Sequence, residues 1–166
     1  MRRMDRALKT PEEILRVLDE CETIRLALHS ETYPYVVPLS FGWEEKDERV
    51  YLYVHGAREG LRHELRARDN RVSIEADRFL GYARTSSSVT CQYESVIGFG
   101  RAEAVEGGEA RHGLELILKH CGYADVPVDD RVLGITSVWR ITLSQLTGKR
   151  RTVWGASRPF SAGRRC

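Results

Sequence analysis

One short segment, Val54–Leu65, constrains this chain most, because a strand must end and a helix must begin within it. The preceding run, Arg49–Val54, is rich in β-branched and aromatic residues, as strands are. The residues that follow bring three potential cations to the start of an amphipathic helix: Arg58, Arg62 and His63. A helix N-terminus already carries partial positive charge, so cations there are unfavourable unless an anion binds beside them. The segment therefore favours an anion site, typically for a phosphate.

The same segment has a simpler interpretation. Basic residues on a short surface helix are commonly solvated, and Glu59 and Glu64 are close enough in sequence to pair with them. The two glycines of the segment, Gly56 and Gly60, loosen the backbone but do not belong to a Walker-type phosphate loop. The helix start alone thus leaves both interpretations open.

Length and composition indicate one soluble globular domain. The chain has 166 residues, of which 42% are hydrophobic and 30% charged, and its formal net charge is +2. This near-neutral charge argues against nucleic-acid binding, even through the basic run 149–151. No apolar run approaches the roughly 18 residues of a membrane span, and the charged N-terminus lacks the apolar core of a signal peptide. We expect a cytoplasmic protein with one domain over 1–150 and a flexible basic tail over 151–166.

The cysteines and histidines do not form a metal-binding pattern. The four cysteines are widely separated, which in a cytoplasmic chain indicates free thiols: Cys21, Cys91, Cys121 and Cys166. Three histidines lie on helix-like segments without ligand spacing: His63, His112 and His120. We therefore predict no metal site.

The spacing of apolar residues predicts a mainly β protein with helices, an α+β fold. Thr10, Pro11 and Glu13 have the sequence of a capping box, so a helix begins there. Two further helices are predicted over 60–68 and 109–121. About six strands are predicted, over 23–29, 35–41, 49–54, 71–76, 91–105 and 136–143. Short links between the early strands favour antiparallel pairing, and the expected architecture is a small barrel covered by helices.

Two strands carry residues that interrupt regular pairing. Pro38 lacks a backbone N–H, so its strand is expected at a sheet edge or broken, with main-chain groups free for a ligand. Gly98 and Gly100 predict a bulge, a bend or a close backbone approach in the long strand. Both positions are candidate walls of a ligand pocket.

The chain shows no local signature of hydrolytic or dinucleotide chemistry. It has no Gly-x-Ser-x-Gly elbow and no recognisable Ser-His-Asp or Cys-His arrangement. The pair Gly98 and Gly100 is followed by Arg101 rather than by a helix, so it fails the dinucleotide-binding fingerprint. His55 is either a strand-end histidine bonded to backbone or part of a ligand pocket. Any enzymatic activity would therefore depend on a bound cofactor.

Blocks along nearly the whole chain, up to about residue 150, resemble a known family in their order and spacing. They comprise a basic start, a first helix, two early strands, a strand with a glycine-arginine loop, a long strand and a closing strand: Met1–Arg6, Ile14–Glu20, Arg25–Leu28, Tyr33–Gly42, Tyr51–Gly60 with Arg62, Tyr93–Ala102 and Ile141–Lys149. They are similar to the pyridoxamine 5′-phosphate oxidase-like flavin-binding split barrels, in particular the nitroimidazole-resistance (Nim-type) branch.

This resemblance implies a six-stranded antiparallel split β-barrel of the FMN-binding type, assembled as a homodimer with FMN at the interface. It implies that Arg58, Gly60 and Arg62 hold the FMN phosphate. By motif, the main chain of Val37, Pro38 and Leu39 would contact the isoalloxazine ring. Ser95 and Val96 would approach the ring or the ribityl chain. His55 would lie at the pocket, and Lys149 would approach the cofactor. Many members carry a basic residue directly before Arg62, where this chain has Leu61 and thus one charge fewer.

The resemblance makes an FMN-dependent oxidoreductase the leading hypothesis, in particular a Nim-type reductase of small flat acceptors such as nitroaromatics or quinones. NAD(P)H is then a candidate reductant and His55 a candidate proton donor. Two alternatives stay open: a non-catalytic flavin- or haem-binding protein, and a vitamin B6 oxidase. Against a vitamin B6 oxidase, the chain lacks a counterpart of that enzyme's arginine-rich C-terminal substrate motif, since Arg164 and Arg165 lie in the tail. Fold alone does not decide among them.

Overall fold

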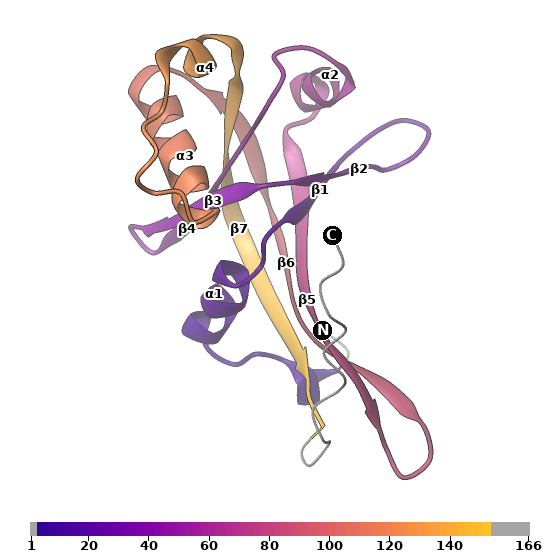
Figure 1. Ribbon diagram of the computed structural model, residues 1–166. Helices are drawn as coiled ribbons and strands as arrows, with labels where there is room; N and C mark the ends of the chain where they lie inside the picture. Colours follow the sequence, from indigo (N-terminus) through magenta and orange to yellow (C-terminus); the bar gives the residue numbers. More distant parts are fainter. Residues whose placement is uncertain (1–2, 154–166) are drawn as a thin grey trace, which may run out of the picture.

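Seven strands form one sheet in the computed structural model, which describes residues 3–153 (Figure 1). Their order across the sheet is β2-β1-β5-β6-β7-β4-β3. The strands are β1 (Ile24–Leu28), β2 (Tyr35–Leu39), β3 (Phe41–Lys46), β4 (Arg49–Gly56), β5 (Arg71–Arg84), β6 (Val89–Val105) and β7 (Ser137–Arg151). Each pair of neighbours in the sheet is antiparallel. The predicted antiparallel, mainly β architecture is therefore confirmed.

The two edge strands of this sheet are consecutive in the sequence. β2 ends at Leu39 and β3 begins at Phe41, so Ser40 alone carries the chain from one edge to the other. One residue spans only about 3.5 Å, and the sheet must therefore curl until its edges come together. Among residues 3–153, β2 and β3 do not pair, so the curled sheet stays open along this seam. The split-barrel prediction is confirmed, with seven strands in place of the expected six and without closure.

Side chains that point into the curled sheet form the hydrophobic core. Residues from strands all around the sheet are fully buried there: Leu26, Leu52, Ile74, Val96, Trp139 and Ile141. Burial of each aliphatic side chain stabilises the fold by roughly 1.5–3 kcal/mol. Helix α1 (Pro11–Asp19) adds Val17 and Leu18 to this core, and α2 (Leu61–Arg68) adds Leu65. The two helices lie toward opposite ends of the sheet (Figure 1).

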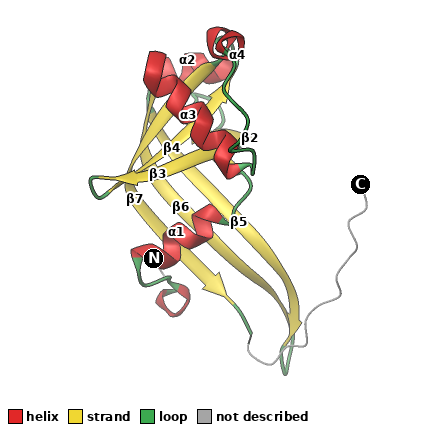
Figure 2. Cartoon of the chain, turned by 60° about the vertical axis from the view of Figure 1, so that its left-hand side comes forward, coloured by secondary structure: helices red, strands yellow, loops and turns green. Residues whose placement is uncertain are grey.

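A smaller apolar cluster lies on the outer face of the sheet. Helix α3 (Gly107–His120) contributes Ala110, Leu114 and Ile117 to it, and the sheet contributes Tyr53 and Val138. Figure 2 shows α3 lying across the sheet, with α4 (Asp130–Ile135) close to the end of β7 that carries Ser137. None of the helices predicted from the sequence covers α4, because this six-residue helix is too short to show a helical pattern of apolar residues.

The predicted start of α1 is confirmed in atomic detail. The Oγ1 of Thr10 accepts a hydrogen bond from the backbone N–H of Glu13 at 3.3 Å. The Glu13 carboxylate accepts from the backbone N–H of Lys9 at 2.9 Å, one residue before the cap. These local bonds satisfy donors that a helix start leaves free, which is why the sequence alone locates this helix.

The hairpin between β3 and β4 is tighter than the sequence indicates. Residues 44–48 have the composition of a turn, whereas β3 continues to Lys46 and only Asp47 and Glu48 turn. Their φ angles are 51° and 60°. Positive φ at both central residues matches the twist of the flanking strands, so a two-residue turn can join β3 to β4 directly. This accounts for the seventh strand.

The three long strands extend beyond their predicted limits. β5 and β7 continue to Arg84 and Arg151, because both remain paired with β6 along most of its length. The pairing of β6 with β7 shifts register between Phe99 and Gly100. A side chain on Gly100 would overlap the backbone of Thr142. The bulge and close approach predicted from the glycines of this strand are therefore confirmed.

A buried carboxylate joins α1, β5 and β7 at one end of the core. Glu94 on β6 is 5% exposed. It accepts hydrogen bonds from Arg16 and Arg150 at 2.6 Å each and from Arg78 at 3.0 Å. Burial alone would raise the pKa of Glu94, but these arginines outweigh it and hold the pKa below its ordinary 4.5. Glu94 therefore stabilises the fold as a carboxylate.

We predict that Glu94→Gln lowers the free energy of unfolding by about 1–3 kcal/mol at pH 7, since it removes the charge that three arginines share. The lowered pKa in the folded state means that this contribution is present above the unfolded pKa, near 4.5, and is lost as the pH falls through the folded value. Urea unfolding at several pH values measures this. Glu64→Gln on the exposed face of α2 is the control, and an equal loss in both variants would contradict the prediction.

Two remaining expectations concern the chain ends and membranes. The predicted tail falls mostly on residues 154–166, which lie outside the described residues. Within residues 3–153, none of the helices combines the length and apolar character that crossing a bilayer requires.

Cys21, Cys91 and Cys121 are free thiols. Burial raises the pKa of the Cys21 thiol to about 11, with Asp77 and Glu75 adding to the effect, so this thiol stays protonated at neutral pH.

Candidate functional site

The junction between β4 and α2 is shaped by two glycines. β4 ends at Gly56, and Gly60 caps α2. The φ of Gly60 is 109°, a backbone angle that residues other than glycine rarely adopt. Any side chain at position 56 would overlap the guanidinium of Arg62, which lies directly against Gly56. The glycines thus let the chain turn sharply and let an arginine lie flat against the strand end.

Arg62 is a partly buried cation without a carboxylate partner. Its guanidinium lies 4.6 Å from the ring centre of Trp139, and its Nη1 donates to the carbonyl oxygen of His55 at 3.3 Å. Among residues 3–153, no carboxylate oxygen lies within 4.0 Å of it. Burial therefore lowers the pKa of Arg62, which remains charged nevertheless. A buried cation of this kind is strongly favourable to an incoming anion.

The neighbouring cations of this junction are also free of carboxylates. Arg58 is exposed and, among residues 3–153, donates only to the carbonyl of Leu133, at 3.4 Å. Glu59 and Glu64 are the nearest acidic residues in sequence, yet neither forms an ion pair with an arginine of this segment in the described part of the chain. Pairing of Arg58 or Arg62 with Glu59 or Glu64 is therefore wrong, whereas solvation of Arg58 stays an alternative because that side chain is exposed.

The two histidines of the junction differ in their surroundings. His55 lies exposed at the end of β4, opposite Val138 of β7. Partial desolvation of its ring lowers the pKa of His55, and the charge on Arg62 lowers it further. His63 packs its ring edge against Trp139, with centroids 5.2 Å apart, and its Nε2 is buried without a hydrogen-bond partner. Burial and two nearby arginines lower the pKa of His63 too, so both imidazoles favour the neutral form.

β2 is an edge strand, as its proline predicts. It pairs only with β1, where Pro38 lies opposite Arg25. Val37 and Leu39 are half-buried against the core, whereas Pro38 is exposed. One side of this strand therefore keeps main-chain donors and acceptors that no neighbouring strand of the described residues uses.

The other predicted cofactor residues lie far from this junction. Ser95 and Lys149 face each other across β6 and β7, and Val96 is fully buried in the core. His55 pairs with Val138, eleven residues before Lys149 on β7. At a strand rise of 3.3 Å per residue, this separation is roughly 35 Å along the strand. One chain therefore brings His55, Arg58, Gly60 and Arg62 together but does not bring Ser95, Val96 and Lys149 to them.

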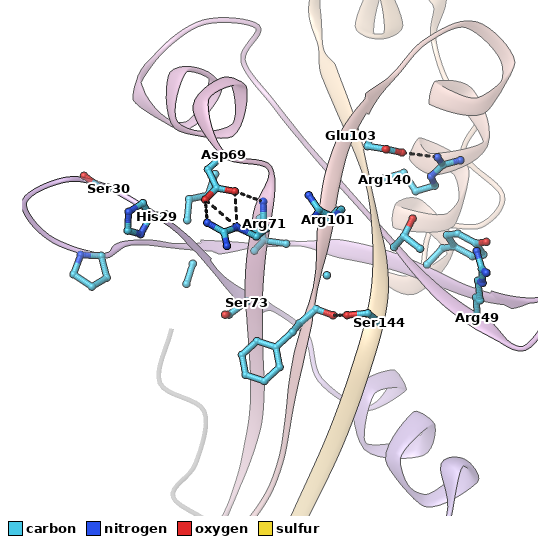
Figure 3. Close-up of a pocket in the computed structure, with 18 residues that line it drawn as sticks. His29, Ser30, Arg49, Asp69, Arg71, Ser73, Arg101, Glu103, Arg140 and Ser144 are labelled. Atoms are coloured by element: carbon cyan, nitrogen blue, oxygen red, sulfur yellow. Dashed lines mark hydrogen bonds and ion pairs between the residues drawn. The ribbon is translucent and has the colours of Figure 1, made fainter.

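A cavity of about 1060 Å³ lies on the face of the sheet opposite the core (Figure 3). Three arginines in its wall are held by other residues. Arg71 pairs with Asp69 at 2.6 Å, Arg140 pairs with Glu103 at 2.7 Å, and Arg101 donates to the Asn70 side chain at 2.8 Å. None of the predicted cofactor residues lines this cavity. Of the four arginines that line this cavity, Arg71 and Arg140 pair with carboxylates, whereas Arg49 and Arg101 have no carboxylate partner among the described residues.

The comparisons with known proteins decide the family. The family model described as pyridoxamine 5′-phosphate oxidase matches residues 10–150. The chain belongs to this family. The family named from the resemblance is thereby confirmed. No curated protein matches the chain.

Several solved structures share the fold of this family member. One, described as a candidate 5-nitroimidazole antibiotic resistance protein from Bacteroides thetaiotaomicron, has a TM-score of 0.78 and 27% identity, with 87% of this chain and 86% of that chain covered. An FAD and haem binding protein from Mycobacterium smegmatis has a TM-score of 0.75 and 18% identity, with 90% of this chain and 75% of that chain covered. The flavocytochrome Anf3 from Azotobacter vinelandii has a TM-score of 0.71 and 21% identity, with 92% of this chain and 72% of that chain covered. The last two show the fold alone.

Arg66 and Trp139 also belong to the junction, although neither is predicted from the sequence. Arg66 follows Arg62 by four residues, so a shared helix face was a readable signal. Its guanidinium lies 5.2 Å from the ring centre of Trp139. Trp139 itself gives no such signal, because it reaches the junction only through the pairing of β7 with β4, where it lies opposite Val54. A contact that depends on strand register cannot be read from local sequence.

We predict that Arg62→Gln raises the pKa of His55 toward its ordinary 6.5, because it removes the nearest positive charge that disfavours the imidazolium. The imidazole resonances of His55, followed by NMR as the pH is changed, measure this directly. Arg58→Gln serves as the control, since Arg58 makes no contribution to the lowered pKa of His55. A His55 titration that is the same in wild type and Arg62→Gln would refute the assignment.

Proposed function

We propose that this protein binds FMN and uses it to reduce small flat aromatic acceptors such as nitroaromatics or quinones. One observation carries the proposal: Arg62 is a partly buried guanidinium with no carboxylate partner in the described chain, beside a second unpaired arginine, Arg58. A phosphate dianion would supply the missing negative charge and accept several hydrogen bonds at once. The residues present therefore fit the phosphate of a flavin nucleotide.

Arg58, Gly60 and Arg62 would hold this phosphate. Gly60 places no side chain in the way, since nothing lies within 4 Å of the position that a Cβ would occupy there. The backbone N–H groups at the start of α2 point toward the same end of the helix, where they favour an anion. Arg62 is also preorganised, because Trp139 and the His55 carbonyl fix its side chain before any ligand arrives.

The free edge of β2 suits the flat ring of the flavin. The main chain of Val37, Pro38 and Leu39 is unpaired on one side, so it can hydrogen-bond to polar atoms at the ring edge. Relatives with the same fold are described as FAD-binding or FAD- and haem-binding proteins, which supports a flavin here. FMN, rather than FAD, follows from the resemblance to the Nim-type branch.

A homodimer would reconcile the two separated groups of predicted cofactor residues. The roughly 35 Å of strand between His55 and Lys149 exceeds the length of an FMN molecule. Two copies with opposite orientation would place Ser95 and Lys149 of one subunit near the junction of the other, whereas Val96 is fully buried in its own core and supports this strand from inside. The outer face of β5 and β6 carries exposed apolar side chains that suit such an interface: Phe79 at 59%, Ile97 at 42% and Phe99 at 46% exposure.

The residues of the junction would also manage protons. When bound, FMN would supply the chemistry of hydride transfer from NAD(P)H to the acceptor. His55 favours the neutral form while Arg62 is unpaired. Burial lowers the pKa of His55 and the Arg62 charge lowers it further, so a phosphate that offsets the Arg62 charge would raise the pKa of His55. His55 would then donate a proton to the reduced acceptor.

We predict that the protein binds FMN more tightly than riboflavin and that the double substitution Arg58→Ala and Arg62→Ala removes this difference. Two charge-assisted contacts to phosphate account for an affinity loss of about 100-fold or more. Fluorescence titration with both ligands measures it, and circular dichroism checks the fold. Arg68→Ala is the matched control, because Arg68 is on the same helix but pairs with Glu31 at 3.6 Å. Unchanged FMN affinity in the double variant would overturn the phosphate assignment.

We further predict that the FMN-loaded protein reduces a nitroimidazole or a quinone with NAD(P)H faster than the same concentration of free FMN. His55→Gln should then lower kcat by about 100-fold while FMN occupancy stays unchanged, because general acid catalysis is lost. The absorbance spectrum of the purified protein separates the alternatives. A haem Soret band in place of flavin bands, or no turnover above free FMN with any acceptor, would exclude the proposed reductase.

A further inference from the structure

Two arginines of α2 share one buried aromatic ring. Arg62 and Arg66 are four residues apart, so their side chains lie on the same face of the helix. Their guanidinium carbons lie 4.6 Å and 5.2 Å from the ring centre of Trp139. The ring is fully buried, and its indole N–H donates to Ser137 Oγ at 3.1 Å, which fixes its orientation. Trp139 thus contacts both cations of this helix face through cation–π interactions.

Arg66 lacks the partners that a structural arginine has. Its Nε is buried without a hydrogen-bond partner, and no carboxylate of the described residues lies within 4.0 Å of its guanidinium. Like charges at positions i and i+4 of a helix repel each other. Within residues 3–153, buried side-chain polar atoms without a partner occur on three residues, and two of these belong to α2: Arg66 and His63. A buried donor without an acceptor is destabilising unless something else satisfies it.

Arg68 differs from Arg62 and Arg66 in having a carboxylate partner. Arg68 belongs to the same helix and is exposed, yet it pairs with Glu31 at 3.6 Å. Carboxylates are therefore within reach of α2, but none is directed at the Trp139 side of the helix. Leu61, which precedes Arg62, is 53% exposed and supplies no charge. The helix concentrates its unpaired positive charge at Arg62 and Arg66.

We infer that Arg66 is a further ligand of the anion that Arg62 binds, and that the Trp139 ring is the platform that positions both guanidiniums for it. The ligand class is a phosphate monoester dianion, which can accept hydrogen bonds from two arginines at once. This inference rests on the proposed function, in which that phosphate belongs to FMN. It adds a residue and a positioning device that the motif around Arg58 and Gly60 does not contain.

The test compares Arg66→Gln with Arg68→Gln as the matched control on the same helix. FMN and riboflavin affinities are measured by fluorescence titration, since the two ligands differ only in the phosphate. Arg66→Gln is expected to weaken FMN binding by about 10- to 100-fold, the effect of one charge-assisted contact, and to leave riboflavin binding unchanged. Arg68→Gln is expected to change neither affinity.

A stability measurement distinguishes a binding role from a structural one. Arg66→Met keeps the apolar stem against Trp139 but removes the unpaired charge. If Arg66 serves the ligand, the melting temperature of the ligand-free Arg66→Met protein is unchanged or higher. A clearly lower melting temperature would instead mean that Arg66 supports the fold, and would overturn the inference. The same variant supplies the FMN and riboflavin affinities if Arg66→Gln does not fold.

The outcomes separate this inference from the proposed function. Wild-type protein that binds FMN no better than riboflavin contradicts the phosphate site as a whole. Wild-type preference for FMN that persists in both Arg66 variants, but is lost when Arg58 and Arg62 are replaced, contradicts only the role of Arg66. Loss of riboflavin binding together with FMN binding in the Arg66 variants would also count against it, because the phosphate would then not be the group that Arg66 contacts.

Discussion

The passage of the chain from β2 to β3 through Ser40 is the constraint on which this structure depends. These strands are the two edges of one seven-stranded sheet, so a one-residue link is compatible only with a sheet that curls back on itself. Curling creates an inside, which Leu26, Ile74 and Ile141 fill. Because the curled sheet does not close, β2 stays unpaired on one side among the described residues. The core and the free strand edge are thus both features of one curled but open sheet.

The same curled sheet supports an arrangement of charges that would be unstable alone. Pairing of β7 with β4 puts Trp139 beneath α2, where it holds Arg62 and Arg66 without carboxylate partners. At the other end of the core, the buried carboxylate of Glu94 accepts hydrogen bonds from three arginines. The arginines at the β4–α2 junction have no such carboxylate among the described residues. Unpaired cations are characteristic of a binding site, where affinity for a ligand is gained at the expense of folding stability.

How far the sequence could be interpreted depended on how local each signal was. The start of α1 follows from Thr10 and Pro11, and the edge position of β2 follows from Pro38, because capping and a missing N–H act within a few residues. The extension of β5 to Arg84 depends on its pairing with β6, so no local pattern reveals it. Likewise, the phosphate candidates Arg58 and Arg62 share one short segment, whereas Ser95 and Lys149 lie far along β6 and β7.

The sequence by itself determined the family, the antiparallel mainly β architecture and the positively charged helix start, since these depend on residue types at short spacing. Only the tertiary structure decided which of those charges are unpaired. Arg68 finds Glu31, while Arg62 and Arg66 find the face of Trp139, a residue more than seventy positions away in the chain. Whether a cation is paired depends on which groups the fold brings within a few ångströms, and that is fixed by strand register and packing rather than by composition.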